Sequence, residues 1–132
     1  MPKEGAMSGK KIAITAKSAD LDGGVESRFG RAHLILLVDP ATMAWQAVDN
    51  PGRSAVGGAG IQVARFLSGE NVRAVVSGEF GPNAQEALKA AGIELYQCDA
   101  HTSARQAVER LKDGDLPRAA PSRKRRLWRS GR

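Results

Sequence analysis

The amino-acid sequence predicts an α/β domain whose mixed sheet of about five strands has helices on both faces. Apolar segments of strand length alternate with segments whose apolar residues recur at helical spacing, a pattern typical of a largely parallel sheet with crossover helices. Two of the strand segments are separated only by turn residues, which predicts a hairpin. The chain has 132 residues, enough for one domain with a substantial core.

The first half of the predicted domain is a strand followed by the hairpin. Residues 11–16 are apolar enough to form a buried strand. Residues 33–39 form a second apolar run, residues 39–42 (Asp-Pro-Ala-Thr) favour a turn, and residues 45–48 can return as an antiparallel partner. The hairpin is expected at an edge of the sheet, because its two strands need no crossover connection.

The second half alternates helices with strands, and right-handed crossovers are expected to place helices on both faces of the sheet. Gly69, Gly92 and Gly114 are expected to end the three helices. Ser103 and Gln106 predict a capping box for the last one. The expected elements are a helix over about 60–68, a strand over 72–77, a helix that begins near Pro82, a strand over 93–97 and a helix after Ser103.

Charge divides the chain into a nearly neutral domain, residues 11–116, and a basic tail, residues 117–132. Seven of the 20 Lys and Arg residues and none of the 14 Asp and Glu residues follow Pro117, so the rest carries 13 − 14 = −1. Like charges repel within the tail and little in it can pack, so we expect it to be disordered. Residues 1–10 are expected to form a flexible leader.

Several classes of protein are excluded by composition. No apolar segment approaches the roughly 20 residues that span a bilayer, and residues 1–11 lack the apolar core of a signal peptide, so a cytoplasmic location is expected. The single cysteine, Cys98, excludes an internal disulfide and every multi-cysteine metal site. A metal-sulfur cluster bound by this chain would therefore bring its own sulfide.

Five blocks of sequence occur in the order and spacing of a known family. They are residues 11–14 (Lys-Ile-Ala-Ile), 27–32 (Ser-Arg-Phe-Gly-Arg-Ala), 50–51 (Asn-Pro) with 57–60 (Gly-Gly-Ala-Gly), 77–84 (Ser-Gly-Glu-Phe-Gly-Pro-Asn-Ala) and 91–96 (Ala-Gly-Ile-Glu-Leu-Tyr). Together they resemble the dinitrogenase iron-molybdenum cofactor-binding family, which includes the NifX-type and NafY-type carriers and the C-terminal domain of NifB.

The resemblance covers residues 11–116 and implies both a fold and a function. The fold is a ribonuclease-H-like α/β domain. The implied function is to bind an iron-molybdenum cofactor, or a related iron-sulfur/molybdenum cluster, and to carry or chaperone it in nitrogen fixation-related cofactor assembly. A donor or recipient protein would then be the partner.

The segment Arg28-Phe29-Gly30-Arg31 departs from the family at one position. Members often have a histidine before the Phe-Gly pair, where a neutral imidazole could ligate a metal, whereas this chain has Arg28. A guanidinium cannot coordinate a metal, but Arg28 and Arg31 can attract an anionic cluster. His33 is the nearest imidazole and is a candidate metal ligand in place of the missing histidine, although a histidine that opens a strand is more often structural.

Two further sets of residues are candidates. Cys98 follows the last predicted strand, where side chains can reach a crevice at the carboxyl ends of the strands, and its thiolate would suit a soft metal; a buried, inert thiol is the plainer reading. The glycine turns before the first two predicted helices can present backbone N–H groups to an anion. Their candidate cofactor-binding residues are Gly57, Gly58, Gly60, Gly78 and Gly81.

Three functions remain open at this point. The first is the cluster carrier; the second is a regulatory or scaffold domain without a cofactor; the third is a weak nucleic-acid binder that uses the basic tail. No Ser/His/Asp arrangement and no metal-spaced carboxylate cluster can be identified in the sequence, so an enzyme is not predicted.

Overall fold

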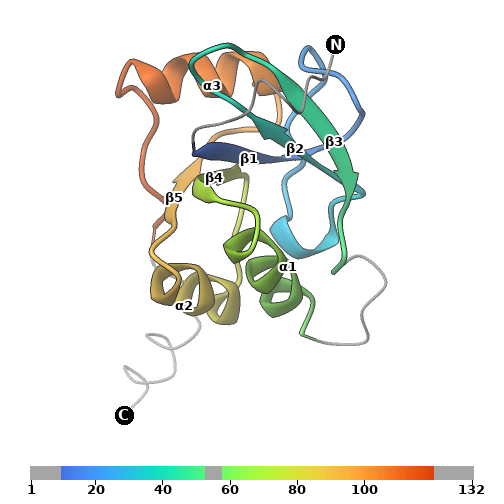
Figure 1. Ribbon diagram of the computed structural model, residues 1–132, viewed down its shortest axis with the longest axis vertical. Coiled ribbons are helices and arrows are strands. Elements are labelled where there is room, and N and C mark those ends of the chain that lie inside the picture. Colours follow the sequence, from blue (N-terminus) through green and yellow to red (C-terminus); the bar gives the residue numbers. More distant parts are fainter. Residues whose placement is uncertain (1–9, 53–57, 121–132) are drawn as a thin grey trace.

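Five strands pair into one mixed sheet in the computed structural model, in the order β3-β2-β1-β4-β5 (Figure 1). The structure describes residues 10–52 and 58–120. The strands are β1 (Lys11–Ala16), β2 (Leu34–Val38), β3 (Trp45–Asp49), β4 (Val72–Ser77) and β5 (Glu94–Gln97). The predicted mixed sheet is confirmed, and so are all five predicted strands to within one residue at either end.

The hairpin of β2 and β3 forms one edge of the sheet. The two strands are antiparallel, with Val38 opposite Trp45 at the turn, and β2 is also antiparallel to the central strand β1. At the turn, the backbone N–H of Asp39 donates to the carbonyl of Ala44, and its carboxylate accepts from the N–H of Ala41. The Asp-Pro-Ala-Thr turn therefore acts as its composition predicted.

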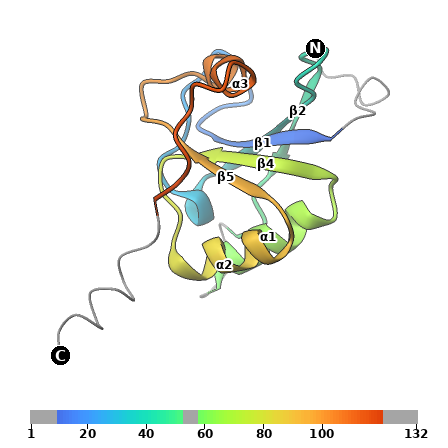
Figure 2. The ribbon, with the colours of Figure 1, turned by 90° about the vertical axis from the view of Figure 1, so that its left-hand side faces the viewer.

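Strands β1, β4 and β5 are parallel to one another, so their connections must cross over one face of the sheet. The helices α1 (Ala59–Ser68) and α2 (Pro82–Ala90) cover one face, and α3 (Ala104–Lys112) covers the other (Figure 2). A separate cluster of buried apolar side chains lies on each face: one includes Val63 and Leu88 from α1 and α2, and the other includes Val108 from α3. Helices on both faces are thus confirmed.

The helix ends follow the predicted capping chemistry. Gly69 is the C-cap of α1, and Pro82 occupies the first turn of α2. The side-chain oxygen of Ser103 accepts from the N–H of Gln106, and the side-chain oxygen of Gln106 accepts from the N–H of Ser103. The predicted capping box of α3 is therefore present. Gly114 follows that helix with φ of 73°, a conformation that favours glycine.

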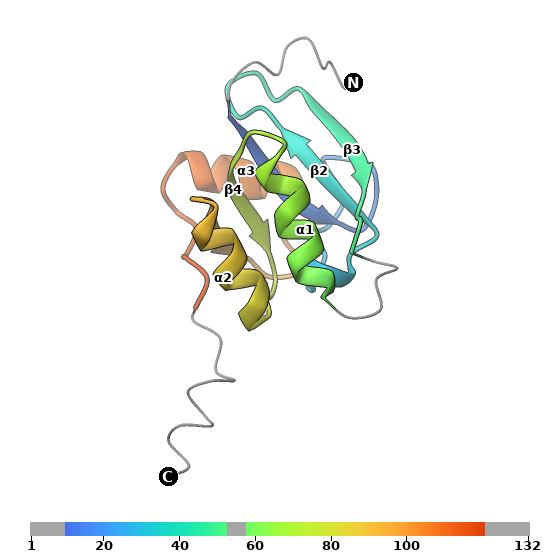
Figure 3. The ribbon, with the colours of Figure 1, turned by 60° about the horizontal axis from the view of Figure 1, so that its bottom comes forward.

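Helices α1 and α2 lie side by side on their face of the sheet, and their N-terminal ends are adjacent (Figure 3). A β-carbon on Gly60 in the first turn of α1 would lie 2.8 Å from the β-carbon of Ala84 in the first turn of α2. Only glycine therefore allows the two helix starts to approach this closely.

The first residues of the predicted tail differ from expectation. The N–H of Gln97 donates to the carbonyl of Pro117, and the N–H of Ala119 donates to the carbonyl of Leu95, so residues 117–120 extend along the outer edge of β5. An edge strand has unpaired backbone groups that a neighbouring segment can satisfy. The sequence did not predict this pairing, because the basic composition of residues 117–132 indicated a disordered tail. Residues 1–9 and 121–132 of the predicted leader and tail lie outside the described residues.

In the part of the chain that the structure describes, no helix is long and apolar enough to cross a membrane.

Candidate functional site

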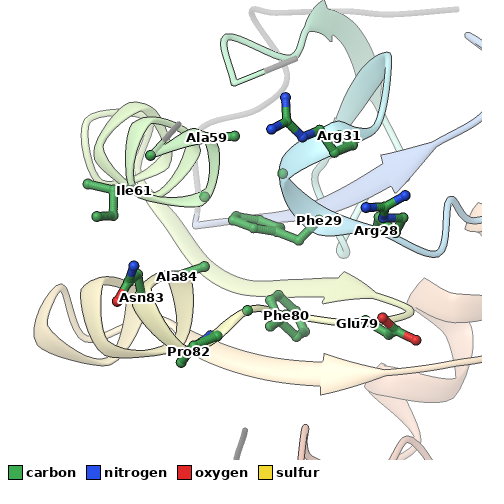
Figure 4. A pocket seen from close by; sticks show the side chains of 14 residues that line it. Arg28, Phe29, Arg31, Ala59, Ile61, Glu79, Phe80, Pro82, Asn83 and Ala84 are labelled. Atoms are coloured by element: carbon green, nitrogen blue, oxygen red, sulfur yellow. The ribbon is translucent and has the colours of Figure 1, made fainter. Parts of the chain in front are cut away.

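A pocket on the described surface lies where the starts of α1 and α2 meet a short 3-10 helix, η2 (Phe29–Arg31) (Figure 4). Its volume is about 370 Å³, within the range of pockets that hold small molecules. Its lining consists of three short segments, each in a connection between two consecutive strands. They are Arg28 to Arg31, Gly58 to Ile61 and Glu79 to Ala84.

The wall formed by residues 28–31 is held against the end of β4 by backbone hydrogen bonding. The N–H of Phe29 donates to the carbonyl of Glu79 at 3.1 Å, and Arg28 forms an isolated bridge with Glu79. One step earlier, Gly78 lies so close to Ser27 that a β-carbon on Gly78 would be 2.6 Å from the α-carbon of Ser27. The loop that leads into η2 and the loop that follows β4 therefore lie together.

A buried polar network fixes the same junction from the sheet side. The hydroxyl of Thr15 on β1 lies 2.9 Å from that of Ser77 on β4 and 2.9 Å from the carbonyl of Glu26. Thr15 and Ser77 are fully buried, so the bond between their hydroxyl groups is shielded from water. The segment that leads into η2 is consequently tied to the two central strands.

Two aromatic rings pack beneath the pocket. The ring centroids of Phe29 and Phe80 are 5.2 Å apart, with the ring planes tilted by 40°, a favourable arrangement for an aromatic pair. Both side chains are buried. Phe29 comes from η2 and Phe80 from the loop before α2, so this contact joins two walls of the pocket through its floor.

Two helix N-termini open into the pocket. Gly58 is the N-cap of α1, with φ of 67°, and Gly81 is the N-cap of α2. Neither N-cap residue supplies a side-chain hydrogen bond, and neither helix has an acidic residue in its first turn. The first N–H groups of an α-helix have no partner within the helix, and the helix dipole gives this end a partial positive charge. The arrangement favours an anion.

Side-chain charge at the pocket is also positive on balance. Arg28 and Arg31 contribute two positive charges and Glu79 contributes one negative charge among the described lining residues. All three side chains belong to exposed residues. In the view of Figure 4, Arg28 and Glu79 lie to one side of the pocket, and Ile61 and Asn83 lie to the other. The charges are therefore placed at the rim, where they can attract a ligand but are partly screened.

Most of the predicted cofactor-binding residues meet in this pocket. The members that line it are Arg28, Phe29, Gly30, Arg31, Gly58, Gly60 and Gly81. Gly57 lies outside the described residues. Gly78 is not part of the lining, because it packs against Ser27 and joins the two loops behind the pocket.

Neither predicted metal ligand is among the residues that line the pocket. His33 is exposed just before β2, and its backbone carbonyl accepts from the N–H of Asn50. Cys98 is half-buried and packs against the core on the α3 side of the sheet, opposite the face that carries the pocket. Burial raises the pKa of the Cys98 thiol, which disfavours the thiolate that metals bind.

No group of three or more His, Cys, Asp or Glu side chains that could hold a metal ion occurs within residues 10–52 and 58–120.

Sequence reasoning missed several lining residues. The lining also includes Ala59, Ile61, Asn83 and Ala84, small or uncharged residues that carry no chemical signature of their own. Their positions carry the signal instead, because each lies at or near the start of a predicted helix, within three residues of a glycine that was already a candidate.

Comparison with known proteins gives a consistent result. The profile of the family described as dinitrogenase iron-molybdenum cofactor matches residues 10–114. No curated protein sequence matches the chain. Among solved structures, the apo form of the orange protein from Desulfovibrio gigas is 43% identical in sequence, with a TM-score of 0.80, over 86% of this chain and 95% of that protein.

Two more distant structures are also similar. A Thermotoga protein provisionally assigned as NifB is 28% identical, with a TM-score of 0.71, over 83% of this chain and 92% of that protein. A Methanocaldococcus jannaschii protein provisionally assigned as a dinitrogenase has a TM-score of 0.61 over 87% of this chain and 99% of that protein. The latter is only 16% identical, so it supports the fold alone.

Proposed function

Because the chain belongs to the dinitrogenase iron-molybdenum cofactor family, we propose that it binds an iron-molybdenum cofactor or a related metal-sulfur cluster and carries it for cofactor assembly without catalysing a reaction. The protein that donates or receives the cluster would be its macromolecular partner.

The observation that carries this proposal is the convergence of two helix N-termini and two arginines on one pocket. Each helix N-terminus is equivalent to roughly half a positive charge, and Arg28 and Arg31 exceed the opposing charge of Glu79 by one. A cluster with bridging or terminal sulfide is an anion whose sulfur atoms accept hydrogen bonds. The backbone N–H groups at the starts of α1 and α2 are suitable donors.

The lining also favours a particular mode of binding. Its described residues include no thiolate and no imidazole, so they would hold a preassembled cluster by charge and hydrogen bonds, with the sulfide supplied by the cluster itself. Binding through such contacts is readily reversible. Reversible binding suits a carrier, which must release its cargo to another protein.

Equilibrium dialysis under anaerobic conditions tests the proposal. The full chain is dialysed against extracted iron-molybdenum cofactor, and separately against tetrathiomolybdate, a simple molybdenum-sulfur dianion. Retained molybdenum is then measured. We expect saturable binding of about one cluster per chain, reduced by raising the salt concentration. Failure to retain either anion at low salt would leave a cofactor-free regulatory domain as the better account.

A second arm tests direct ligation by His33. Because His33 does not line the pocket, we expect His33→Ala to bind with unchanged affinity and an unchanged absorption spectrum. A shifted spectrum or a loss of binding would instead establish the imidazole as a ligand.

Adding double-stranded DNA as a competitor separates cluster binding from weak nucleic-acid binding, since DNA should not displace a cluster from the pocket.

A further inference from the structure

We propose that Asn50 is a positioning residue of the pocket, because its buried side-chain amide joins the wall that carries the two arginines to the wall formed by α1. The inference rests on the proposed function, since it concerns how the same pocket is held in a binding geometry.

Asn50 follows the last residue of β3 and is only 3% exposed. Its side-chain Nδ2 donates to the carbonyl of Phe29 at 3.2 Å, and its Oδ1 accepts from the N–H of Gly52 at 2.9 Å. Both bonds are buried, where a polar group without a partner is costly. One end of the amide therefore holds a distant segment of backbone at Phe29, and the other end closes a turn within residues 50–52.

Each of these segments is part of, or packs against, a wall of the pocket. Phe29 begins η2, whose three residues all line the pocket. Gly52 lies against the first turn of α1, because a β-carbon there would be 2.5 Å from the carbonyl oxygen of Ala59 and 2.7 Å from Cγ2 of Val63. Asn50 thus links η2 to the segment that supports the start of α1.

The two walls also touch directly, with no long side chain between them. A β-carbon on Gly30 in η2 would lie 3.2 Å from the backbone nitrogen of Gly60 in α1. That contact is a close steric approach without a side chain of its own, so it sets how close the walls can be but not how they are oriented. The directional hydrogen bonds of Asn50 supply the orientation.

Only asparagine offers both bonds in this geometry. The carbonyl of Phe29 requires a donor and the N–H of Gly52 requires an acceptor, which fixes which end of the amide faces each partner. An aspartate would keep the acceptor and place a carboxylate oxygen against the Phe29 carbonyl. A leucine of similar size would leave both backbone groups without a partner.

The test compares Asn50→Asp and Asn50→Leu with Val108→Ala. Val108 is fully buried on the α3 side of the sheet, so its truncation lowers stability without touching the pocket. Affinity for tetrathiomolybdate is measured by dialysis of the full chain, at a temperature where every variant is folded. Amide hydrogen exchange of residues 28–31 and 59–61 is measured without ligand.

We expect both Asn50 variants to bind at least about tenfold more weakly than the unmodified chain. Val108→Ala should stay within about twofold of it, since distant sites act independently. In the absence of ligand, exchange should accelerate at residues 28–31 in the Asn50 variants and remain slow in β1 and β4. A merely structural role would instead accelerate exchange throughout the domain.

The outcomes separate this inference from the proposed function. If the unmodified chain binds and Asn50→Asp binds equally well, or loses no more than Val108→Ala, Asn50 does not position the pocket. If the unmodified chain fails to bind, the proposed function fails, and the exchange data alone decide whether Asn50 holds η2. Asn50→Ser, smaller and uncharged, replaces either variant that does not fold.

Discussion

Arginine side chains and backbone N–H groups, rather than thiolate and imidazole, are what the described part of the pocket offers a ligand. Arg28 and Arg31 lie at its exposed rim, and the N–H groups of two helix starts lie within it. The resemblance to the family pointed to the segment that contains the arginines, and their charge then made them candidates. The sequence could not place His33 and Cys98 relative to the pocket, because the face of the sheet on which a residue at a strand end packs depends on register.

Removing the two charges should weaken cluster binding in a salt-dependent way. For Arg28→Gln with Arg31→Gln, we expect a loss of about three- to tenfold in affinity for tetrathiomolybdate at low salt, shrinking toward none near 1 M, where the Debye length is about 3 Å. Dialysis across a salt series provides the measurement. Arg65→Gln is the control for each single variant, Arg28→Gln or Arg31→Gln, because it also removes one charge and Arg65 lies in the last turn of α1, at the end away from the pocket.

An equal loss at all salt concentrations would contradict the electrostatic role of Arg28 and Arg31. An equal loss in the Arg65→Gln control would show that the net charge of the protein matters and the position of the charge does not.

Cys98 should make the protein less stable at alkaline pH. Burial raises the pKa of its thiol, so the native state holds this proton more tightly than the unfolded chain does. Its contribution to the free energy of unfolding is complete below the ordinary thiol pKa of about 8.5 and is lost as pH rises through the elevated native value. The pKa of Tyr96 is also raised by burial and acts in the same direction.

The Cys98→Ser variant isolates the thiol from Tyr96. Thermal midpoints measured between pH 7 and pH 10.5 should fall more steeply for the unmodified chain than for the variant. Parallel curves for the two proteins would mean that the thiol is not sufficiently buried to affect stability.

The secondary-structure elements followed closely from local sequence patterns. The runs at 11–16 and 72–77 are mostly apolar, without strict alternation, because these strands are buried on both faces. Glycines and the Ser103 capping box marked where helices end or begin. The 3-10 helix at Phe29–Arg31 was not predicted, because a single short turn leaves no periodicity. Its position depends on tertiary bonds to Glu79 and Asn50.

The close approach of the two helix starts should depend on Gly60. Gly60→Ala would place a β-carbon 2.8 Å from that of Ala84. Such overpacking costs about 1–3 kcal/mol, against a helix-propensity gain of about 1 kcal/mol. We expect a lower thermal midpoint and weaker tetrathiomolybdate binding, because the helices must separate. The added change Ala84→Gly should restore binding by removing the opposing methyl group.

Gly69→Ala is the control for this prediction, since Gly69 is the C-cap of α1, away from the pocket, and a β-carbon built there would be 3.6 Å from the nearest atom. The steric account fails if Ala84→Gly does not rescue Gly60→Ala, or if Gly69→Ala is equally damaging.

The molecule as a whole is a sheet covered on both faces, and its last described segment closes one edge. Residues 117–120 pair with β5, and two side chains reinforce them: Nε2 of Gln85 donates to the carbonyl of Ala120, and Oε1 of Gln97 accepts from its N–H. Charge along the sequence predicted a break near Pro117. Pairing of an edge strand by a segment without strand character could not be predicted locally, because it depends on tertiary contact.

Two truncations test where the domain ends. A chain that stops at Ala120 keeps the pairing with β5, and its thermal midpoint should be unchanged. A chain that stops at Leu116 loses the bonds made by Pro117, Ala119 and Ala120. We expect its midpoint to fall by about 5 °C or more, corresponding to roughly 1 kcal/mol in a domain of this size. Equal midpoints for the two truncations would show that residues 117–120 contribute nothing to stability.

The most direct test of the central claim is to locate the bound anion. The full chain, labelled with ¹⁵N, is titrated with tetrathiomolybdate, whose molybdenum(VI) is diamagnetic, and backbone amide shifts are followed by NMR. We expect the largest changes at residues 28–31, 58–61 and 79–84, the three segments that line the pocket. Changes centred on Cys98 and α3, or scattered over the surface without saturation, would contradict the assignment of this pocket as the cluster-binding site.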